Sequence, residues 1–334
     1  MKIPKHHFKI LYIVLSIFVL LLILATFNFG DDKKIIWGVT FSKKQCQDLD
    51  LDWRLVYTKI LNEMPIQTIR LPLYWDDIET SPNNYNFEDY IWMTNQAAER
   101  NIEILPVLGR RVPRWPECHT PTFYKNFPED EIQTKILALI HQEVLFFQNY
   151  PNINKWQIDN EPFLNVFGKC PPSDKDFLNS EIDLVRSLDN RPILITESGE
   201  LSTWINGAKH ADIVGTSMYR QTWNRAWGYF TYPLGPWYYY FKAQIVKLFT
   251  GVDDIINTEL QVEPWAFSNN LKLMDLSDQF YTMDLNQIKN NVKFAKRSGI
   301  NEIYLWGLEW WWWLGQEHGI WEFWEYGKTL NNTK

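Results

Sequence analysis

Two glutamates stand near the ends of apolar stretches that are far apart in the chain. Glu161 belongs to "WQIDNEP" (156–162) and Glu259 to "DIINTEL" (254–260). A single acid at the end of an apolar strand is usually a solvated cap. Two carboxyl groups held near each other titrate differently, because their repulsion keeps one protonated while the other stays ionised. Such a pair supplies a proton donor together with a nucleophile or base.

The stretches that carry these glutamates belong to a series of short apolar runs with polar ends. Most of the runs are nearly continuous in apolar residues, which is typical of buried parallel strands. The pattern predicts eight strands, at 35–41, 66–73, 102–109, 153–160, 192–198, 211–219, 254–260 and 302–308.

Helical periodicity lies between these strands, at 51–64, 88–101, 130–150, 174–190, 202–210 and 284–299. The long aromatic segment 220–249 predicts a hairpin-like loop that leads into a further helix. Alternating strands and helices predict an α/β fold, a (β/α)8 TIM barrel. An open doubly wound sheet would need a glycine-rich loop after its first strand, and "SKKQCQDLD" contains no glycine.

A barrel gathers its reactive side chains at the carboxyl ends of its strands. Strands four and seven, which carry Glu161 and Glu259, face each other across such a barrel. Facing carboxyl groups suit glycoside hydrolysis, in which an acid protonates the leaving oxygen and a carboxylate attacks the anomeric carbon or activates water. The other strand ends carry Arg70, Asn160, Glu197, Tyr219 and Trp306.

Three motifs together resemble a known group of enzymes. "DNEP" after strand four, "TEL" on strand seven and "IRLPLYWDDIETSPNNYNFEDY" (69–90) are similar to clan A of the glycoside hydrolases. Its members are retaining (β/α)8 enzymes. Patterns of the cellulase-like family 5 and of the β-galactosidase-like family 42 are both similar, and the family within the clan stays open.

The resemblance implies a role for each matching residue. Glu161 resembles the general acid/base, and Glu259 resembles the nucleophile. Asn160 resembles the residue that hydrogen-bonds the sugar 2-hydroxyl. Arg70 and Tyr219 resemble the pair that binds the nucleophile and keeps it ionised.

Aromatic residues are unusually frequent, at 16% of the chain with 18 tryptophans. Flat rings stack on the apolar faces of sugars, although many of these rings also suit a core. Trp306 resembles the platform under the −1 sugar. We expect Trp37, Trp75 and Trp115, with the run 310–313, to supply further sugar contacts.

Two other acids near the strand ends leave alternatives open. Glu263, four residues beyond Glu259 in "TELQVEPW", is a second candidate nucleophile, although it lies past the strand and before a proline. Glu197 either binds substrate hydroxyls or forms a structural ion pair.

No cofactor or metal is expected. The chain has no CxxC pair, and no His-x-His follows the first strand. The predicted function is therefore retaining hydrolysis of β-linked glycosides or polysaccharides. The alternatives are a transglycosidase, a carbohydrate-binding protein on an inactive barrel, and, with less support, a metal-dependent hydrolase.

The amino terminus predicts a membrane anchor. Residues 10–27 are almost wholly apolar and follow Lys2, Lys5 and Lys9, which should stay cytoplasmic. We expect residues 1–30 to be a basic tail and transmembrane signal anchor, and residues 31–334 to be an extracytoplasmic glycosidase domain. Cleavage of residues 1–30 as a signal peptide, followed by secretion, is the alternative.

Charge and cysteines agree with an exported enzyme. The chain has 33 Lys and Arg and 40 Asp and Glu residues. Lys2, Lys5 and Lys9 are in residues 1–30, which contain no acid, so the remainder carries 30 basic and 40 acidic side chains. This balance argues against a nucleic-acid partner and does not single out another. The expected partners are a glycan, which the resemblance implies, and the membrane, which the amino-terminal segment implies. Cys118 and Cys170 fall in loops after strands three and four, so we expect them to form a disulfide, with Cys46 left free.

Overall fold

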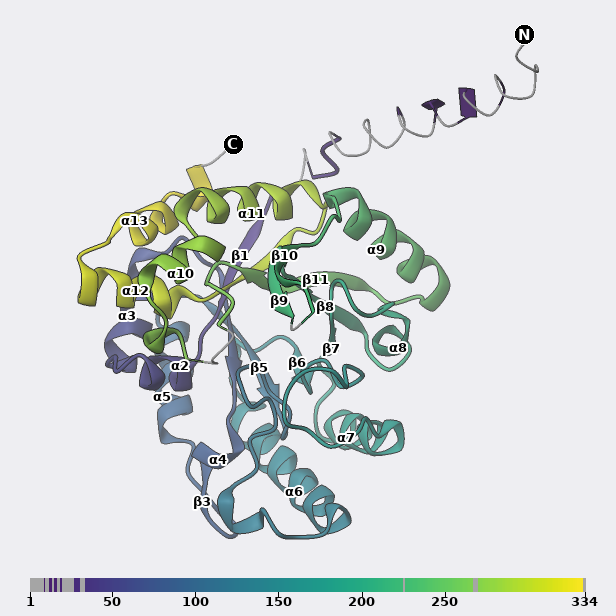
Figure 1. Ribbon diagram of the computed structural model, residues 1–334. Coiled ribbons are helices and arrows are strands. Elements are labelled where there is room, and N and C mark those ends of the chain that lie inside the picture. Colours follow the sequence, from purple (N-terminus) through teal and green to yellow (C-terminus); the bar gives the residue numbers. More distant parts are fainter. Residues whose placement is uncertain are drawn as a thin grey trace, which may run out of the picture.

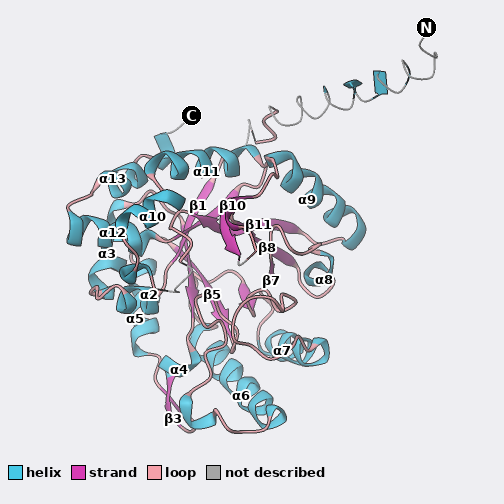
Figure 2. Cartoon of the chain, viewed as in Figure 1, coloured by secondary structure: helices cyan, strands magenta, loops and turns pink. Residues whose placement is uncertain are grey.

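The computed structural model describes residues 9, 12–13, 15–16, 19, 27–30, 34–224, 226–266 and 270–332. Eight parallel strands close into a barrel, with helices around it (Figures 1 and 2). In their order around the barrel the strands are β1 (Ile36–Thr40), β12 (Glu302–Trp306), β11 (Asp254–Gln261), β8 (Ile213–Met218), β7 (Ile193–Glu197), β6 (Trp156–Ile158), β5 (Glu103–Leu108) and β2 (Thr68–Pro72). The predicted (β/α)8 barrel is confirmed, and each of its strands overlaps a predicted one.

Twelve helices are described outside the barrel: α2 (Lys43–Asp48), α3 (Trp53–Glu63), α4 (Trp75–Ile78), α5 (Glu88–Ala98), α6 (Glu129–Phe147), α7 (Lys175–Leu188), α8 (Ile205–Ala208), α9 (Pro236–Thr250), α10 (Leu276–Thr282), α11 (Leu285–Arg297), α12 (Leu308–His318) and α13 (Glu322–Lys328). Aspartates at 52, 174 and 284 begin α3, α7 and α11, because their side chains accept hydrogen bonds from first-turn N–H groups. The helix predicted at 202–210 is only the short α8.

The inside of the barrel is filled by side chains, as the fold requires. Leu105, Leu194, Ile256 and Tyr304 form a small apolar cluster of their own. Gly38 on β1 makes room for one of them, since a Cβ at this position would lie 2.6 Å from the Tyr304 ring. The reactive end of the barrel therefore stands on a packed core.

Two short hairpins interrupt the alternation of strands and helices. The first pairs β3 (Glu79–Ser81) with β4 (Asn84–Tyr85). The second pairs β9 (Gln221–Asn224) with β10 (Gly228–Thr231) and precedes α9. This second pairing confirms the hairpin that the aromatic segment 220–249 predicts.

Most of the predicted anchor lies outside the described residues. In the part of the chain that is described, no helix combines the length and apolar character needed to cross a bilayer. Residues 27–30, which follow the apolar run, lie against the barrel, where the Phe29 N–H donates to the carbonyl of Arg297.

Candidate active site

A cavity of about 580 Å³ opens at the carboxyl ends of the barrel strands. We call it the mouth cavity. Seven of the residues named from the sequence line it, namely Trp115, Asn160, Glu161, Tyr219, Glu259, Glu263 and Trp306. The β9–β10 hairpin supplies part of the wall through Trp223 and Phe230, so the aromatic segment after β8 reaches the site.

Arg70 lies fully buried below this cavity, on β2, and binds three of its neighbours. Its Nη1 donates to Glu259 Oε1 at 2.7 Å, and its Nη2 donates to Asn160 Oδ1 at 2.7 Å. Its Nε donates to Gln157 Oε1, also at 2.7 Å. One guanidinium thus fixes side chains from β6 and β11 at a set separation, which a planar fork of donors does well.

Glu259 is held at both carboxylate oxygens. Besides the ion pair with Arg70, its Oε2 accepts a hydrogen bond of 3.1 Å from the Tyr219 hydroxyl. The pairing of β11 with β8 shifts register between Asn257 and Glu259, so β11 carries a bulge there. Bulges re-aim side chains next to active sites, and this one helps to turn Glu259 toward the mouth. Arg70 and Tyr219 thus fix the position of this carboxyl group.

Glu161 has the opposite environment. Its side chain reaches the mouth cavity, and among the described residues no cation lies at hydrogen-bond distance from it. Its Oε1 accepts a 3.2 Å hydrogen bond from the Ser217 hydroxyl. Burial raises the pKa of Glu161 well above its usual range, and the Glu259 and Glu117 carboxylates raise it further. A carboxyl group in such a setting keeps its proton and can donate it.

The backbone around Glu161 is unusual. Asp159 and Glu161 both have positive φ, at 54° and 47°, although neither is glycine. The Glu161 N–H donates to Thr196 Oγ1 at 2.8 Å, which holds the strained turn in place. Strain of this kind is concentrated at functional sites and persists only where neighbours enforce it.

A third carboxylate, Glu117, was not predicted from the sequence. It is buried in the loop after β5 and accepts a 2.8 Å hydrogen bond from Asn160 Nδ2. Burial and the Glu259 carboxylate raise the pKa of Glu117 to about 7, against the opposing effect of the Asn160 hydrogen bond. The sequence could have indicated Glu117 by its position, because it lies next to Cys118 in a loop at the carboxyl end of the third strand.

Replacing Glu117 with glutamine is expected to move the alkaline limb of kcat/KM to lower pH. The glutamine oxygen can still accept from Asn160, whereas the negative charge that raises the pKa of Glu161 is removed. We expect the difference between this variant and the wild type above about pH 7, where Glu117 is ionised. A move of one pH unit would correspond to about 1.4 kcal/mol of lost repulsion.

The matched control for that variant is Asp48→Asn, which removes a carboxylate from the exposed rim of the mouth cavity. The pH dependence of kcat/KM for both variants gives the answer. An unmoved limb in Glu117→Gln, or an equal move in Asp48→Asn, would show that the Glu117 charge does not act on Glu161.

Trp306 and Glu263 meet at Arg114. The Arg114 guanidinium lies 4.0 Å from the Trp306 ring centroid, and its Nη1 donates to Glu263 Oε1 at 2.5 Å. A sugar that stacked on Trp306 would have to share that ring with Arg114. Glu263 is thus paired with a different cation, whereas Arg70 and Tyr219 both bind Glu259. The geometry favours Glu259 as the nucleophile.

Three predicted substrate contacts do not lie in the mouth cavity. Trp37 is 1% exposed and packs in the main hydrophobic core. Trp75 is fully buried, and its indole N–H donates to Glu79 at 2.6 Å. Glu197 is 2% exposed and accepts a 2.7 Å hydrogen bond from the Gly207 N–H, which connects α8 to β7. Each therefore has a structural partner in place of substrate, which corrects the prediction.

The tryptophan run at 310–313 is also structural. It forms part of α12, and all four rings are at most 6% exposed. The Trp311 indole N–H donates to the Val262 carbonyl, and that of Trp310 donates to Gln279. The prediction that this run binds sugar is wrong, because its rings fill the space between α12 and its neighbours. Trp115 does line the mouth cavity.

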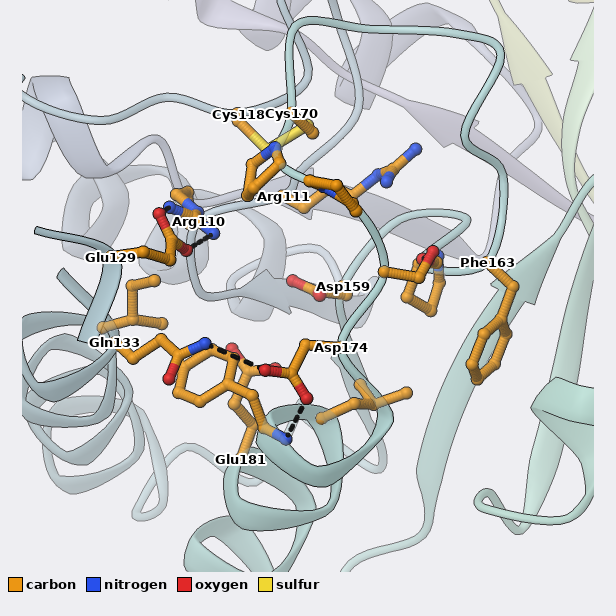
Figure 3. Close-up of a pocket in the computed structure, with 17 residues that line it drawn as sticks. Arg110, Arg111, Cys118, Glu129, Gln133, Asp159, Phe163, Cys170, Asp174 and Glu181 are labelled. Atoms are coloured by element: carbon orange, nitrogen blue, oxygen red, sulfur yellow. Dashed lines mark hydrogen bonds and ion pairs between the residues drawn. A yellow bond between two sulfur atoms is a disulfide. The ribbon is translucent and has the colours of Figure 1, made fainter.

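Asp159 lines a second, smaller cavity of about 150 Å³ (Figure 3). The disulfide between Cys118 and Cys170 lines it, as predicted from the loop positions, and Cys46 is free and buried. The Arg110–Glu129 ion pair lines another part of its wall (Figure 3). The disulfide joins the loop that carries Glu117 to the loop that follows Glu161, so it braces the acid side of the site.

Among the described residues, no group of three or more histidine, cysteine, aspartate or glutamate side chains is arranged to hold a metal ion.

No family model matches the chain, and no curated protein matches its sequence. Solved structures match over most of its length. A GH5_18 enzyme from Bifidobacterium longum shares 12% identity with a TM-score of 0.58, covering 81% of this chain and 69% of its own. A GH10 endoxylanase from a sugarcane soil metagenome shares 13% identity with a TM-score of 0.56, covering 84% and 87%.

A GH10 endo-β-1,4-xylanase from Gloeophyllum trabeum is similar to the same extent, with 14% identity, a TM-score of 0.53 and coverage of 84% and 85%. Identities this low establish a shared fold and nothing finer. The shared fold is the (β/α)8 barrel, and the similar structures are glycoside hydrolases of families 5 and 10.

Proposed function

We propose that this protein is a retaining glycoside hydrolase that cleaves β-linked glycosides or polysaccharides. The arrangement around Arg70 carries the proposal. One buried guanidinium binds both Glu259 and Asn160, the neighbour of Glu161. Glu161 itself holds its proton, since burial and nearby carboxylates raise its pKa. The two roles of double displacement are thereby separated.

The proposed reaction has two steps. Glu259 attacks the anomeric carbon while Glu161 gives its proton to the leaving oxygen, so the glycosidic bond breaks and a glycosyl ester on Glu259 forms. Glu161, now a carboxylate, then takes a proton from water, whose oxygen displaces Glu259 and releases the sugar. Asn160 is placed to bind the 2-hydroxyl, and Tyr219 and Arg70 take up the charge of Glu259 when it leaves.

The neighbours in fold support a proposal for the substrate class. Two of them are described as β-1,4-xylanases, one as a β-galactosidase, and one is bound to Manβ1-4GlcNAc. We therefore propose a β-linked glycan, and the mouth cavity of about 580 Å³ has the size of a site for a small oligosaccharide. The sugar and linkage depend on loop contacts that differ among enzymes of one fold.

Anchoring and compartment form a separate part of the proposal. We propose that residues 1–30 hold the chain in the membrane and that residues 31–334 are extracytoplasmic. The apolar run 10–27, its lysine flank and the Cys118–Cys170 disulfide support this arrangement. Carbonate-resistant membrane association, together with protease access to the barrel in intact cells, would test it against secretion of a cleaved form.

The activity can be tested with the full-length chain in detergent. Aryl β-glycosides and β-glucan, xylan, galactan and mannan polysaccharides should identify a substrate, and ¹H NMR should show the β-anomer as the first product. An α-anomer formed first would contradict retention. Binding of a glycan without turnover would favour the inactive-barrel alternative, and new glycosidic bonds in place of reducing ends would favour a transglycosidase.

A further inference from the structure

Helix α9 exposes an apolar stripe where a surface helix normally carries polar residues. The stripe consists of Phe241, Ile245, Leu248 and Phe249, which are 40%, 52%, 79% and 77% exposed. Their spacing of four, seven and eight residues places them on one face of the helix. The opposite face packs on the barrel through residues that include Tyr239, Ala243 and Val246.

The cations of α9 do not cover this stripe. Lys242 donates to the carbonyls of Gly199 and Ser202, at 2.8 and 2.6 Å, and so turns toward the barrel. Lys247 pairs with Asp254 at 2.6 Å. Four large apolar side chains together are more than the single exposed residues that any soluble surface carries, and such patches mark a contact surface.

The amino-terminal segment arrives beside the stripe. Phe29 stacks on Tyr240 with ring centroids 4.4 Å apart, and its ring lies 5.6 Å from that of Phe241. Arg297, at the end of α11, donates to the Phe27 carbonyl at 3.2 Å. Residues 27–30 therefore dock next to α9, and the apolar run 10–27 joins the domain at this point.

We propose that the apolar stripe of α9 lies in the interfacial layer of a lipid bilayer. The run 10–27 is suited to hydrocarbon, so the surface next to its end is the surface that a membrane would meet. The stripe has the composition of an interfacial helix, whose apolar face sinks roughly 5–10 Å into the headgroup and acyl boundary. Because its own lysines are engaged with the barrel, the contact depends on apolar side chains and needs no anionic lipid.

The placement also orients the catalytic site. The carboxyl end of α9 leads into the start of β11, and residues 27–30 lie at Arg297, before the start of β12. Both therefore belong to the amino-terminal end of the barrel, opposite the mouth cavity. A bilayer on the stripe leaves the mouth open to glycans that approach from the aqueous side. This inference stands apart from the proposed reaction.

The experiment uses an environment-sensitive fluorophore on Ile245→Cys in the full-length chain. The chain is reconstituted in phosphatidylcholine vesicles that contain lipids brominated near the headgroup end of the acyl chain. Leu145→Cys on α6 is the matched control, because Leu145 is a similarly exposed apolar residue, at 40%, on a different helix. We expect a blue shift and bromine quenching at 245 and neither at 145.

Equal quenching at both positions, or none at 245, would overturn the proposal. Energy transfer between differently labelled chains at 245, persisting when the vesicles are diluted in lipid, would assign the stripe to a second copy of the chain. A variant with glutamine at all four stripe positions should keep its thermal melting and glycosidase activity. If that variant still places a label at Gln244→Cys in the bilayer, the apolar side chains are not what holds α9 there.

Discussion

Glu259→Ala is expected to lower kcat on every substrate by about 10⁴-fold or more, the scale on which loss of a catalytic nucleophile is felt. The alanine leaves a space beside Arg70 and Tyr219, the two residues that bind the carboxylate. Azide can enter that space and attack the anomeric carbon once, so part of the activity should return. The product of a β-glycoside should then be the α-glycosyl azide, which NMR identifies.

The same substitution also removes the partner of a fully buried guanidinium. Breaking a buried ion pair typically costs about 3–5 kcal/mol, so the alanine variant should melt at lower temperature. Glu259→Gln is the better control for folding, because its amide oxygen can still accept from Arg70 while it cannot act as an anionic nucleophile. Both variants should be inactive, and the glutamine variant should be the more stable.

Glu263→Ala separates the two candidate nucleophiles. Glu263 pairs with Arg114 and has no contact with Arg70 or Tyr219 among the bonds of the described site. Its loss should change substrate affinity more than kcat, and azide should not rescue it. Normal turnover in Glu259→Ala with lost turnover in Glu263→Ala would assign the nucleophile to Glu263.

The barrel could be predicted because its evidence is local. Continuous apolar runs with helical segments between them are set by neighbours in sequence, and each predicted strand overlaps an observed one. The strand ends followed directly, since parallel strands bring their carboxyl ends together. The strand ends, together with the resemblance of the motifs, therefore indicate Arg70, Asn160, Tyr219 and Glu259 as site residues, and the four side chains do lie in bonded contact.

The predictions were wrong where the sequence does not reveal whether a side chain points into the core or into the mouth cavity. Trp37 lies on a strand that is apolar on both faces, so the pattern does not reveal that its ring packs in the core outside the mouth. The sequence of the run 310–313 is the same whether its rings contact sugar or fill the core. In the structure, the buried acceptors of the Trp310 and Trp311 indole N–H groups show that these rings belong to the core. Glu117 joins the site through its hydrogen bond with Asn160, which lies 43 residues away in the sequence. A local pattern does not reveal such a contact.

Glu161→Ala is expected to change activity according to the leaving group. With alkyl or sugar leaving groups, which need a proton, kcat/KM should fall by about 10²–10⁴-fold, the usual contribution of general acid catalysis. With a dinitrophenyl leaving group, which departs as a stable anion, the first step should be nearly unaffected and the glycosyl-enzyme should accumulate. Measurement of kcat/KM over aryl glycosides of different leaving-group pKa gives the slope that separates the two cases.

The pH dependence of activity distinguishes a proton donor from a residue with a merely structural role. In the proposed mechanism the protonated form of Glu161 is the active one, and burial with the Glu259 and Glu117 carboxylates raises its pKa. Activity of the wild-type chain should therefore persist above the normal range of a glutamic acid and fall as pH rises through that raised pKa. In Glu161→Ala the residual kcat/KM on substrates whose leaving groups need a proton should lose this alkaline limb, because the variant has no Glu161 proton to lose. If the limb stays, another group gives the proton, and Glu117, whose pKa is about 7, is the first to examine by the same substitution.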